Sequence, residues 1–331
     1  MPTVSVVIPT HNRARMLQDA LRSVLHQTYR DFEVIVVDDG STDDTRRQIA
    51  EFQNDTRLRY LYQENRGLAA ARNTGIRASH GEYVALLDDD DLWLPSKLEK
   101  QVHLLEVNDQ IAVAYCDFRF VDVSGNLIAT KWRRPASRAT IYEGLMYDNV
   151  IAGSGSAVLI RRQCLEEVGP FDESLQASED QDLWRRIALK HRFGYIDEVL
   201  VHIRWHPQSM QRNPERMARG KLHYLEKLRM EVPTRLRNHL PNVTYHTYAS
   251  IAWTFFDVDR FDEAKPFIRR IANLGPGFLL RFVLTLCFYS ARNPISMLRI
   301  WLSRGRDNDT RSRSVELALR LSCDLFRGYR H

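Results

Sequence analysis

Four consecutive aspartates are the residues in this chain best suited to chemistry: Asp88, Asp89, Asp90 and Asp91. Adjacent carboxylates repel one another, so such a run needs solvent or a cation to screen it. An acidic surface loop is the usual explanation, but here residues 83–87 have the apolar pattern of a buried strand. We therefore expect a Mg²⁺ or Mn²⁺ site, because hard cations bind one or two carboxylates and take further oxygens from water and phosphate. If the strand continued through the run, Asp88 and Asp90 would point the same way.

A second acidic cluster follows Ser178 and contains Glu179 and Asp180. It fits the first turn of a helix, where a serine caps and acids complement the helix dipole. It also fits a general base that removes the proton of an attacking hydroxyl group. The spacing alone does not separate the two interpretations.

Two further clusters contain residues that suit a nucleotide. Residues 37–43 predict a turn from a strand to a helix, in which Gly40 relieves the backbone and Ser41 caps the helix. The aspartate carboxylates of this segment are also suited to bind a base or ribose. Residues 64–75 predict a helix start, which suits an anion. Close helix–sheet packing would explain the small residues of this segment, but it explains Arg72 and Asn73 less well.

These clusters are separated by alternating strand and helix patterns. Strands are predicted at residues 4–8, 32–37, 58–62, 83–87, 111–115, 158–160, 195–196 and 200–203, and helices at 13–26, 42–52, 68–79, 97–107, 161–168 and 182–190. This order predicts an α/β fold with a mostly parallel sheet covered on both faces. Ligands of such sheets bind beyond the carboxyl ends of the strands, so residues 9–13, 38–41 and 88–91 should converge on one edge.

The chain is helical in pattern from residue 213, which predicts a main domain at 1–212 and a helical region at 213–331. Residues 248–274 have the spacing of a helix-turn-helix. Residues 278–302 are apolar but interrupted by arginines, and predict either a buried helical hairpin or an interfacial segment.

The charge of the chain is unevenly distributed. The net charge is +5, while residues 204–331 hold 23 Lys/Arg and 11 Asp/Glu, or +12, which leaves −7 for the rest. A basic C-terminal region suits nucleic acid or anionic membrane. Few aromatic residues interleave with the arginines, so we expect no nucleic acid but peripheral contact with a membrane. Four cysteines without metal or disulfide spacing indicate a reducing cytoplasm.

In their order along residues 4–206, these motifs resemble the family 2 glycosyltransferases of the GT-A fold. The motifs are VIPTHNR from Val7, VDDGSTD from Val37, NRG from Asn65 with ARNTG from Ala71, LDDDD from Leu87 and SED from Ser178. The resemblance implies an enzyme that needs a divalent metal and inverts the anomeric carbon. Its donor would be a nucleotide-diphosphate sugar, most often a UDP-sugar. Its acceptor would be a glycan or a lipid-linked acceptor in cell-surface polysaccharide biosynthesis, used at the inner face of the membrane.

The resemblance also implies roles for single residues. The nucleotide would contact Pro9, Thr10, Asn12, Asp39, Arg72, Asp88 and Asp89, although Asp89 could equally face solvent. The metal would be bound at Asp90 and Asp88, with Asp91 and His206 as further candidates; His206 could equally be structural. Asp180 would be the catalytic base, with Glu179 near the acceptor. The donor sugar or acceptor would lie at Gly153, Ser154, Gly155 and Trp184.

Two other functions stay open. A sugar nucleotidyltransferase shares a similar sheet, but the segment 9–13 lacks the glycines of its phosphate loop. A non-catalytic protein that binds nucleotide sugars would not need Asp88, Asp90 and Asp180 together.

Overall fold

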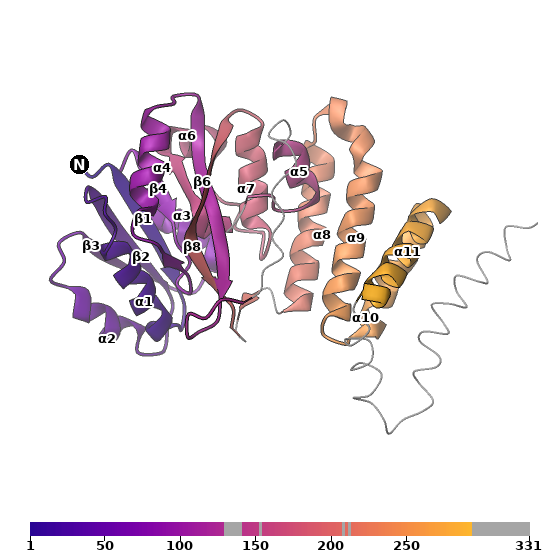
Figure 1. Ribbon diagram of the computed structural model, residues 1–331, viewed down its shortest axis with the longest axis horizontal. Helices are drawn as coiled ribbons and strands as arrows, with labels where there is room; N and C mark the ends of the chain where they lie inside the picture. The colour runs from indigo at the N-terminus through magenta and orange to yellow at the C-terminus, as the bar shows by residue number, and fades with distance from the viewer. Residues whose placement is uncertain (129–140, 152–153, 207–208, 211–212, 293–331) are drawn as a thin grey trace, which may run out of the picture. The chain divides into compact units, whose positions relative to one another are not determined.

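The computed structural model describes residues 1–128, 141–151, 154–206, 209–210 and 213–292. The chain divides into two compact units, Met1–Arg237 and Asn238–His331. We describe each unit by itself (Figure 1).

The first unit is built on a sheet that has eight strands within the described residues. The strands are β1 (Val4–Thr10), β2 (Phe32–Asp39), β3 (Leu58–Gln63), β4 (Tyr83–Leu86), β5 (Leu92–Trp93), β6 (Ile111–Val121), β7 (Val158–Arg161) and β8 (Arg192–Arg204). Their order is β3-β2-β1-β4-β7-β6-β8-β5. The strands β3, β2, β1 and β4 are parallel neighbours, as are β6 and β8, whereas β7 and β5 run antiparallel to their neighbours. The expected mostly parallel sheet is confirmed.

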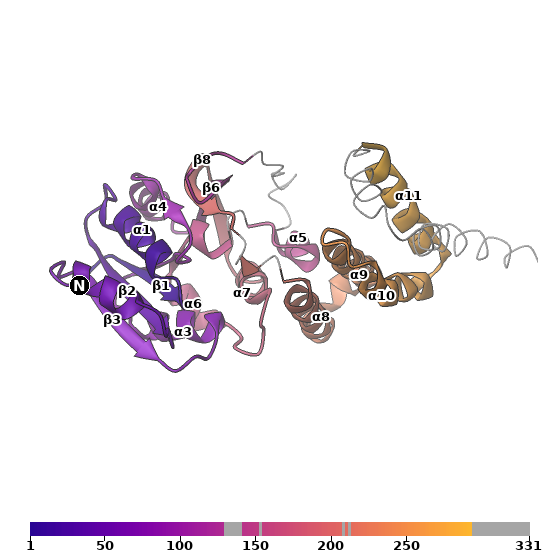
Figure 2. The same ribbon diagram turned by 90° about the horizontal axis from the view of Figure 1, so that it is seen from below.

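Helices cover both faces of this sheet (Figure 2). They are α1 (Ala14–Leu25), α2 (Thr45–Ile49), α3 (Leu68–Ala78), α4 (Lys97–Glu106), α5 (Ile141–Tyr147), α6 (Arg162–Val168) and α7 (Glu179–Ala188). In β1, Val6 and Ile8 pack in one core cluster with α1 and α4. Val7 points to the other face and packs in a second cluster with α3, α6 and α7. Because both of its faces are covered, β1 is buried throughout and reads as an almost continuous apolar run.

Some elements differ from their predicted bounds. The helix expected at 42–52 is a short α2 followed by a 3-10 turn, Ala50–Phe52. The strands expected at 195–196 and 200–203 are one strand, β8, whose pairing with β6 shifts register near Cys116 and Asp117. Such a bulge interrupts the two-residue alternation that marks a strand in sequence.

The helix α8 (Pro214–Glu231) belongs to the first unit. Its Lys227 forms ion pairs with Asp172 at 2.7 Å and with Asp182 of α7 at 3.0 Å. Its Tyr224 hydroxyl donates to the carbonyl of Leu145. The first unit therefore ends at Arg237, later than the expected boundary at residue 212, because these contacts attach α8 to α7 and α5.

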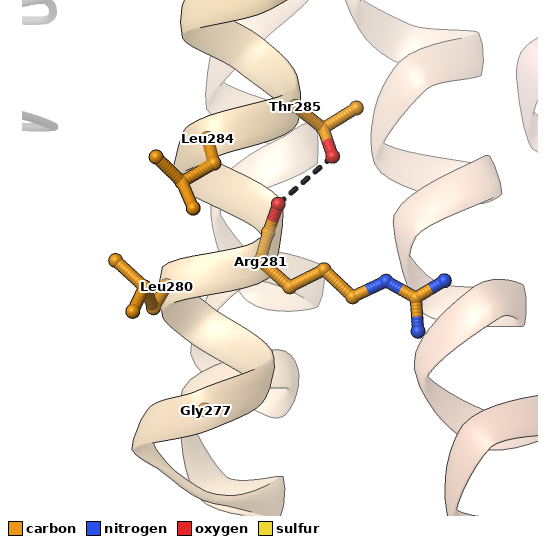
Figure 3. Close-up of a pocket in the computed structure, with 5 residues that line it drawn as sticks. All are labelled: Gly277, Leu280, Arg281, Leu284 and Thr285. Atoms are coloured by element: carbon orange, nitrogen blue, oxygen red, sulfur yellow. Dashed lines mark hydrogen bonds between the residues drawn. The ribbon is translucent and has the colours of Figure 1, made fainter.

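The second unit contains α9 (Leu240–Phe256), α10 (Phe261–Leu274) and α11 (Pro276–Arg292). The helix-turn-helix expected at 248–274 is present as α9 and α10. Figure 3 shows Leu280 and Leu284 on one side of α11 and Arg281 extending from another. These leucines are 43% and 59% exposed, which a fully buried hairpin does not explain. Residues 293–302 of that predicted segment lie outside the described residues. No helix in the described part of the chain is both long and apolar enough to span a bilayer.

Candidate active site

The three polar strand ends meet at one edge of the sheet, as predicted. The Thr10 hydroxyl at the end of β1 donates to Asp89 Oδ2 at 2.7 Å, beyond the end of β4. The Asn12 amide oxygen accepts from the backbone N–H of Thr42 at 2.7 Å, in the loop that follows β2. Asn12 has φ 55°, a strained value for a residue other than glycine.

The four aspartates form a turn instead of a strand extension. Strand β4 ends at Leu86, and the Asp91 N–H donates to the Asp88 carbonyl at 3.0 Å. The condition for Asp88 and Asp90 to point the same way, a strand that continues through the run, is therefore not met. The carboxylate of Asp88 accepts from Arg72 at 2.6 Å, whereas that of Asp90 accepts from Arg13 at 2.8 Å.

Asp89 does not face solvent, contrary to one expectation. It is 4% exposed and accepts from Thr10 and, at 2.9 Å, from Arg13. Burial raises the pKa of Asp89 to about 6, with the charge of Arg13 acting in the opposite direction. With protein donors on both of its oxygens, Asp89 fixes the turn and is poorly placed to contact a nucleotide.

Asp91 is also held by protein groups. It is 4% exposed, and its oxygens accept from the Ser156 hydroxyl at 2.5 Å and from the Arg204 N–H at 3.2 Å. The Ser156 hydroxyl also accepts from the N–H of Asp88 at 3.1 Å. Burial and the charges of Asp90 and Asp88 raise the pKa of Asp91. These contacts argue against Asp91 as a metal ligand.

Asp90 and His206 form the pair best suited to a cation. Asp90 Oδ2 lies 2.9 Å from His206 Nε2, and their side chains are 15% and 1% exposed. Burial would raise the pKa of Asp90, but the hydrogen bond from His206 and the charge of Arg13 lower it. His206 Nδ1 is buried and has no hydrogen-bond partner among the described residues.

The chemistry of this pair fits Mg²⁺ or Mn²⁺ in part. The described residues contain no group of three or more His, Cys, Asp or Glu side chains that could hold a metal. One carboxylate and one imidazole suffice when phosphate and water supply the remaining ligands. The fit therefore depends on a phosphate-bearing substrate.

Arg72 connects the aspartate turn to the acidic cluster of α7. It is 1% exposed and donates through Nη2 to Asp88 and through Nη1 to Glu179 at 2.9 Å. Its guanidinium lies 5.3 Å from the ring centroid of Phe171. Burial alone would lower the pKa of Arg72, but the charges of Asp88 and Glu179 raise it above its ordinary value. The two ends of the site are therefore joined through one buried cation.

Glu179 and Asp180 have different surroundings. Glu179 is 3% exposed and paired with Arg72, so it does not reach an acceptor as expected. Asp180 is partly exposed, and its Oδ2 accepts from Asn149 at 3.0 Å. Burial, followed by the charge of Glu179, raises the pKa of Asp180 to about 7. A partly exposed carboxylate with this pKa suits a general base near neutral pH.

The residues expected near the sugar have three different outcomes. A Cβ at Gly155 would lie 3.1 Å from Arg72 Nη2, so this glycine does border the site. Gly153 lies outside the described residues, as does the side chain of Ser154. Trp184 is 0% exposed and packs edge-on against Phe171, so it belongs to the core and offers no surface to a sugar.

Asp39 and Pro9 differ from their expected roles. The Asp39 carboxylate accepts from Gln63 at 2.7 Å and from the N–H groups of Arg66 and Gly67 at 2.9 and 2.8 Å. It therefore fixes the start of α3, with little capacity left for a base or ribose. Pro9 is buried within β1, paired with Val37 of β2.

Several residues of the site were not predicted. Arg13, Asn149, Ser156 and Arg204 all bind a carboxylate or carbonyl of the two acidic clusters. Arg13 stood within a quoted motif and Ser156 directly follows the predicted Gly155, but nothing in the sequence indicated their partners. Asn149 and Arg204 have no local signal.

The description "Glycosyl transferase family 2" belongs to a family model that matches residues 5–169. A curated protein of Escherichia coli is 31% identical over 195 residues, which are 59% of this chain and 73% of that protein. Its name is UDP-Glc:alpha-D-GlcNAc-diphosphoundecaprenol beta-1,3-glucosyltransferase WfgD. An uncharacterized glycosyltransferase of Rickettsia conorii is 34% identical over 203 residues, 61% of this chain. The chain spans only 32% of that relative's length.

Solved structures show the same fold. A mannosyltransferase from Pyrobaculum calidifontis, in complex with GDP-Man and Mn²⁺, aligns with a TM-score of 0.60 and 22% identity over 91% of this chain and 83% of that chain. TarS 1–349 of S. aureus, in complex with UDP, aligns with a TM-score of 0.52 and 18% identity over 80% of this chain and 90% of that chain. Both likenesses concern the GT-A fold alone. On its sequence similarity and its fold together, this chain belongs to glycosyl transferase family 2.

Proposed function

We propose that this protein transfers a sugar from a nucleotide-diphosphate donor to a hydroxyl group, with inversion at the anomeric carbon. The observation that carries the proposal is the bridge from Asp88 through Arg72 to Glu179, directly beside Asp180. The bridge connects the strand ends, where an α/β sheet binds its ligand, to the residue next to Asp180. The pKa of Asp180, raised to about 7, suits a general base near neutral pH.

In this mechanism, Asp180 accepts the proton of the acceptor hydroxyl as its oxygen attacks the anomeric carbon. Asn149 orients the carboxylate by donating to its Oδ2. One displacement needs one base, and no covalent sugar–enzyme intermediate forms. Retaining glycosidases, by contrast, work with a pair of carboxylates in an acid/base and a nucleophilic role.

The leaving diphosphate carries negative charge that the site must balance. Asp90 and His206 are the residues that would hold a divalent cation. When bound, such a cation offsets charge on the diphosphate. Arg13, which is hydrogen-bonded to Asp89 and Asp90, is a protein cation directly beside this pair.

We further propose a UDP-sugar donor and a glycan or lipid-linked acceptor used in cell-surface polysaccharide biosynthesis. Support comes from the names of two E. coli relatives, WfgD and a chondroitin synthase that is 30% identical over 201 residues. The basic region 204–331 suits an anionic inner membrane surface, where a lipid-linked acceptor would be located. Flotation with anionic liposomes tests this contact, and absence of binding at low salt would contradict it.

The transfer itself is tested by a screen of UDP-, GDP- and dTDP-sugars with Mn²⁺ or Mg²⁺, with EDTA as the control. We expect release of the nucleoside diphosphate from one donor and loss of that release in EDTA. The anomeric proton signal in the NMR spectrum of the product should show that the configuration at the anomeric carbon is inverted. Retention of configuration would reject the mechanism. Pyrophosphate release from a sugar phosphate and a nucleoside triphosphate would reject the transferase in favour of a nucleotidyltransferase. Binding of a donor without turnover would indicate a non-catalytic protein that binds nucleotide sugars.

A further inference from the structure

A buried polar cluster lies behind the aspartate turn. It consists of Trp93 of β5 and Lys97 and Gln101 of α4. Lys97 and Gln101 are 0% exposed and Trp93 is 3% exposed. Lysine and glutamine are rarely buried to this degree without hydrogen-bond partners. The partners therefore indicate what the cluster does.

Each of the three side chains donates to a different backbone carbonyl. The pairs are Trp93 Nε1 with Ser156 at 2.8 Å, Gln101 Nε2 with Ala157 at 2.8 Å, and Lys97 Nζ with Val158 at 3.5 Å. These carbonyls belong to the 3-10 turn Ser154–Ala157 and to the first residue of β7. A buried carbonyl needs a partner, and side chains supply one here.

Lys97 is held in this cluster by hydrogen bonds and an aromatic ring, without an ion pair among the described residues. Its ammonium donates to Gln101 Oε1 at 2.7 Å and lies 3.8 Å from the ring centroid of Trp93. No carboxylate pairs with it in the part of the chain that the structure describes. Burial lowers the pKa of Lys97 to about 7. An apolar side chain would fill the same space without this desolvation, so packing alone does not explain a lysine.

The residues whose carbonyls the cluster binds also contact the aspartate turn. Ser156, whose carbonyl Trp93 holds, donates through its hydroxyl to Asp91 and accepts from the Asp88 N–H. Gly155, the residue before Ser156, lies against Arg72. A shift of the 3-10 turn would therefore move the groups that surround Asp88.

We propose that Trp93, Lys97 and Gln101 are positioning residues for sugar transfer, because they hold the carbonyls of residues 156–158 and thereby fix the Ser156 hydroxyl against the aspartate turn. The inference rests on the proposed function. None of the three touches a reacting atom; they act through Ser156.

The test compares Gln101→Met with Gln27→Met in the full chain. Gln27 is also 0% exposed, but it donates to the Leu94 carbonyl and accepts from the Leu98 N–H, at 2.8 and 3.0 Å, away from residues 156–158. Gln101 also donates to the Ala114 carbonyl, and Gln27 to the Ser23 carbonyl, each at 3.2 Å. The same substitution thus removes three side-chain hydrogen bonds beside α4 in each variant. Tm, kcat and the donor KM are measured for both.

We expect similar losses of Tm in the two variants. In Gln101→Met, kcat should fall by at least about tenfold with the donor KM changed less than about threefold, since small misplacements at a reacting centre can cost about a hundredfold. In Gln27→Met, kcat should stay within about twofold of the parent. Equal kcat values in the two variants would overturn the positioning role.

Should Gln101→Met fail to fold, Trp93→Phe removes the indole N–H that holds Ser156 while keeping an aromatic ring. A drop of at least about tenfold in its kcat supports the inference, and the parent kcat overturns it. A parent protein that transfers no sugar from any nucleotide-diphosphate donor would overturn the proposed function first, and this inference with it.

Discussion

Arg72 Nη2 lies 2.6 Å from Asp88 Oδ1, and Nη1 of the same guanidinium lies 2.9 Å from Glu179 Oε1. One buried side chain from α3 thus spans the aspartate turn and the first residue of α7. Arginine suits this position because its planar group donates in two directions at once and keeps its charge when buried. The relative placement of Asp88 and Asp180 depends on it.

Replacing Arg72 with Met should destabilise the protein strongly. Glu179 would remain buried without its cation, and loss of one partner of a buried pair costs about 3–5 kcal/mol. Arg66→Met is the matched control, because Arg66 pairs with Glu173 at the surface, where a pair contributes about 0–1 kcal/mol. Urea unfolding measures both. Similar free energies of unfolding in the two variants would show that the buried bridge contributes little.

Replacing Asp180 with Asn should slow transfer strongly while leaving the fold intact. A general base contributes about 10²- to 10⁴-fold to the rate, so kcat should fall within that range. The Asn carbonyl can still accept from Asn149, so the variant should fold and its donor affinity should change little. Asp109→Asn is the control, because Asp109 is 95% exposed. Transfer by Asp180→Asn at the parent rate would remove the base assignment.

Strands and helices were predictable where one local pattern was sufficient. The continuous apolar run of β1 and the 3.6-residue spacing of α1 each reflect a face that is buried whatever the rest of the chain does. The register shift between β6 and β8 was not predictable, because a bulge depends on the partner strand. The place of α8 in the first unit was not predictable for the same reason, since Lys227 reaches α7 through side chains distant in sequence.

The candidate site was predictable as a set of motifs, but the division of roles within it was not. Asp88 to Asp91 are alike in sequence, and their differences come from Arg72, Arg13, His206 and Ser156, which lie far away in the chain. Trp184 was misassigned because it stands one helical turn after Asp180. Its side chain nevertheless packs in the core beside Phe171. Proximity in sequence to the proposed base did not indicate which face of the helix is open.

The pH dependence of transfer should follow Asp180. Its carboxyl, with a pKa raised to about 7 by burial and Glu179, accepts a proton only when ionised. The value of kcat should therefore rise from pH 5 to about 7 and level off above. A profile without a rise in this interval would contradict the assignment.

The same pKa shift has a consequence for stability. The folded state keeps the Asp180 proton up to about pH 7, whereas the unfolded carboxyl loses it near 3.8. Between these values the folded state binds more protons, so this contribution to the free energy of unfolding falls as pH rises. Urea titrations of the parent and Asp180→Asn at pH 5 and pH 8 measure it. The pKa of Asp89 is also raised, but it contributes to the stability of both proteins, so its effect cancels in the difference between them.

Metal activation should depend on Asp90 and His206 and not on Asp91. In Asp90→Asn and His206→Asn, the Mn²⁺ concentration for half-maximal transfer should rise at least about tenfold, an effect that loss of even a supporting contact can produce. In Asp91→Asn it should stay near the parent value, because both oxygens of Asp91 accept from Ser156 and Arg204. That variant should instead lose stability, by about 1–3 kcal/mol for a buried donor left unpaired. Activity as a function of Mn²⁺ concentration, with urea unfolding of each variant, distinguishes the roles. A rise confined to Asp91→Asn would move the metal to Asp91 and leave Asp90 and His206 as a structural pair.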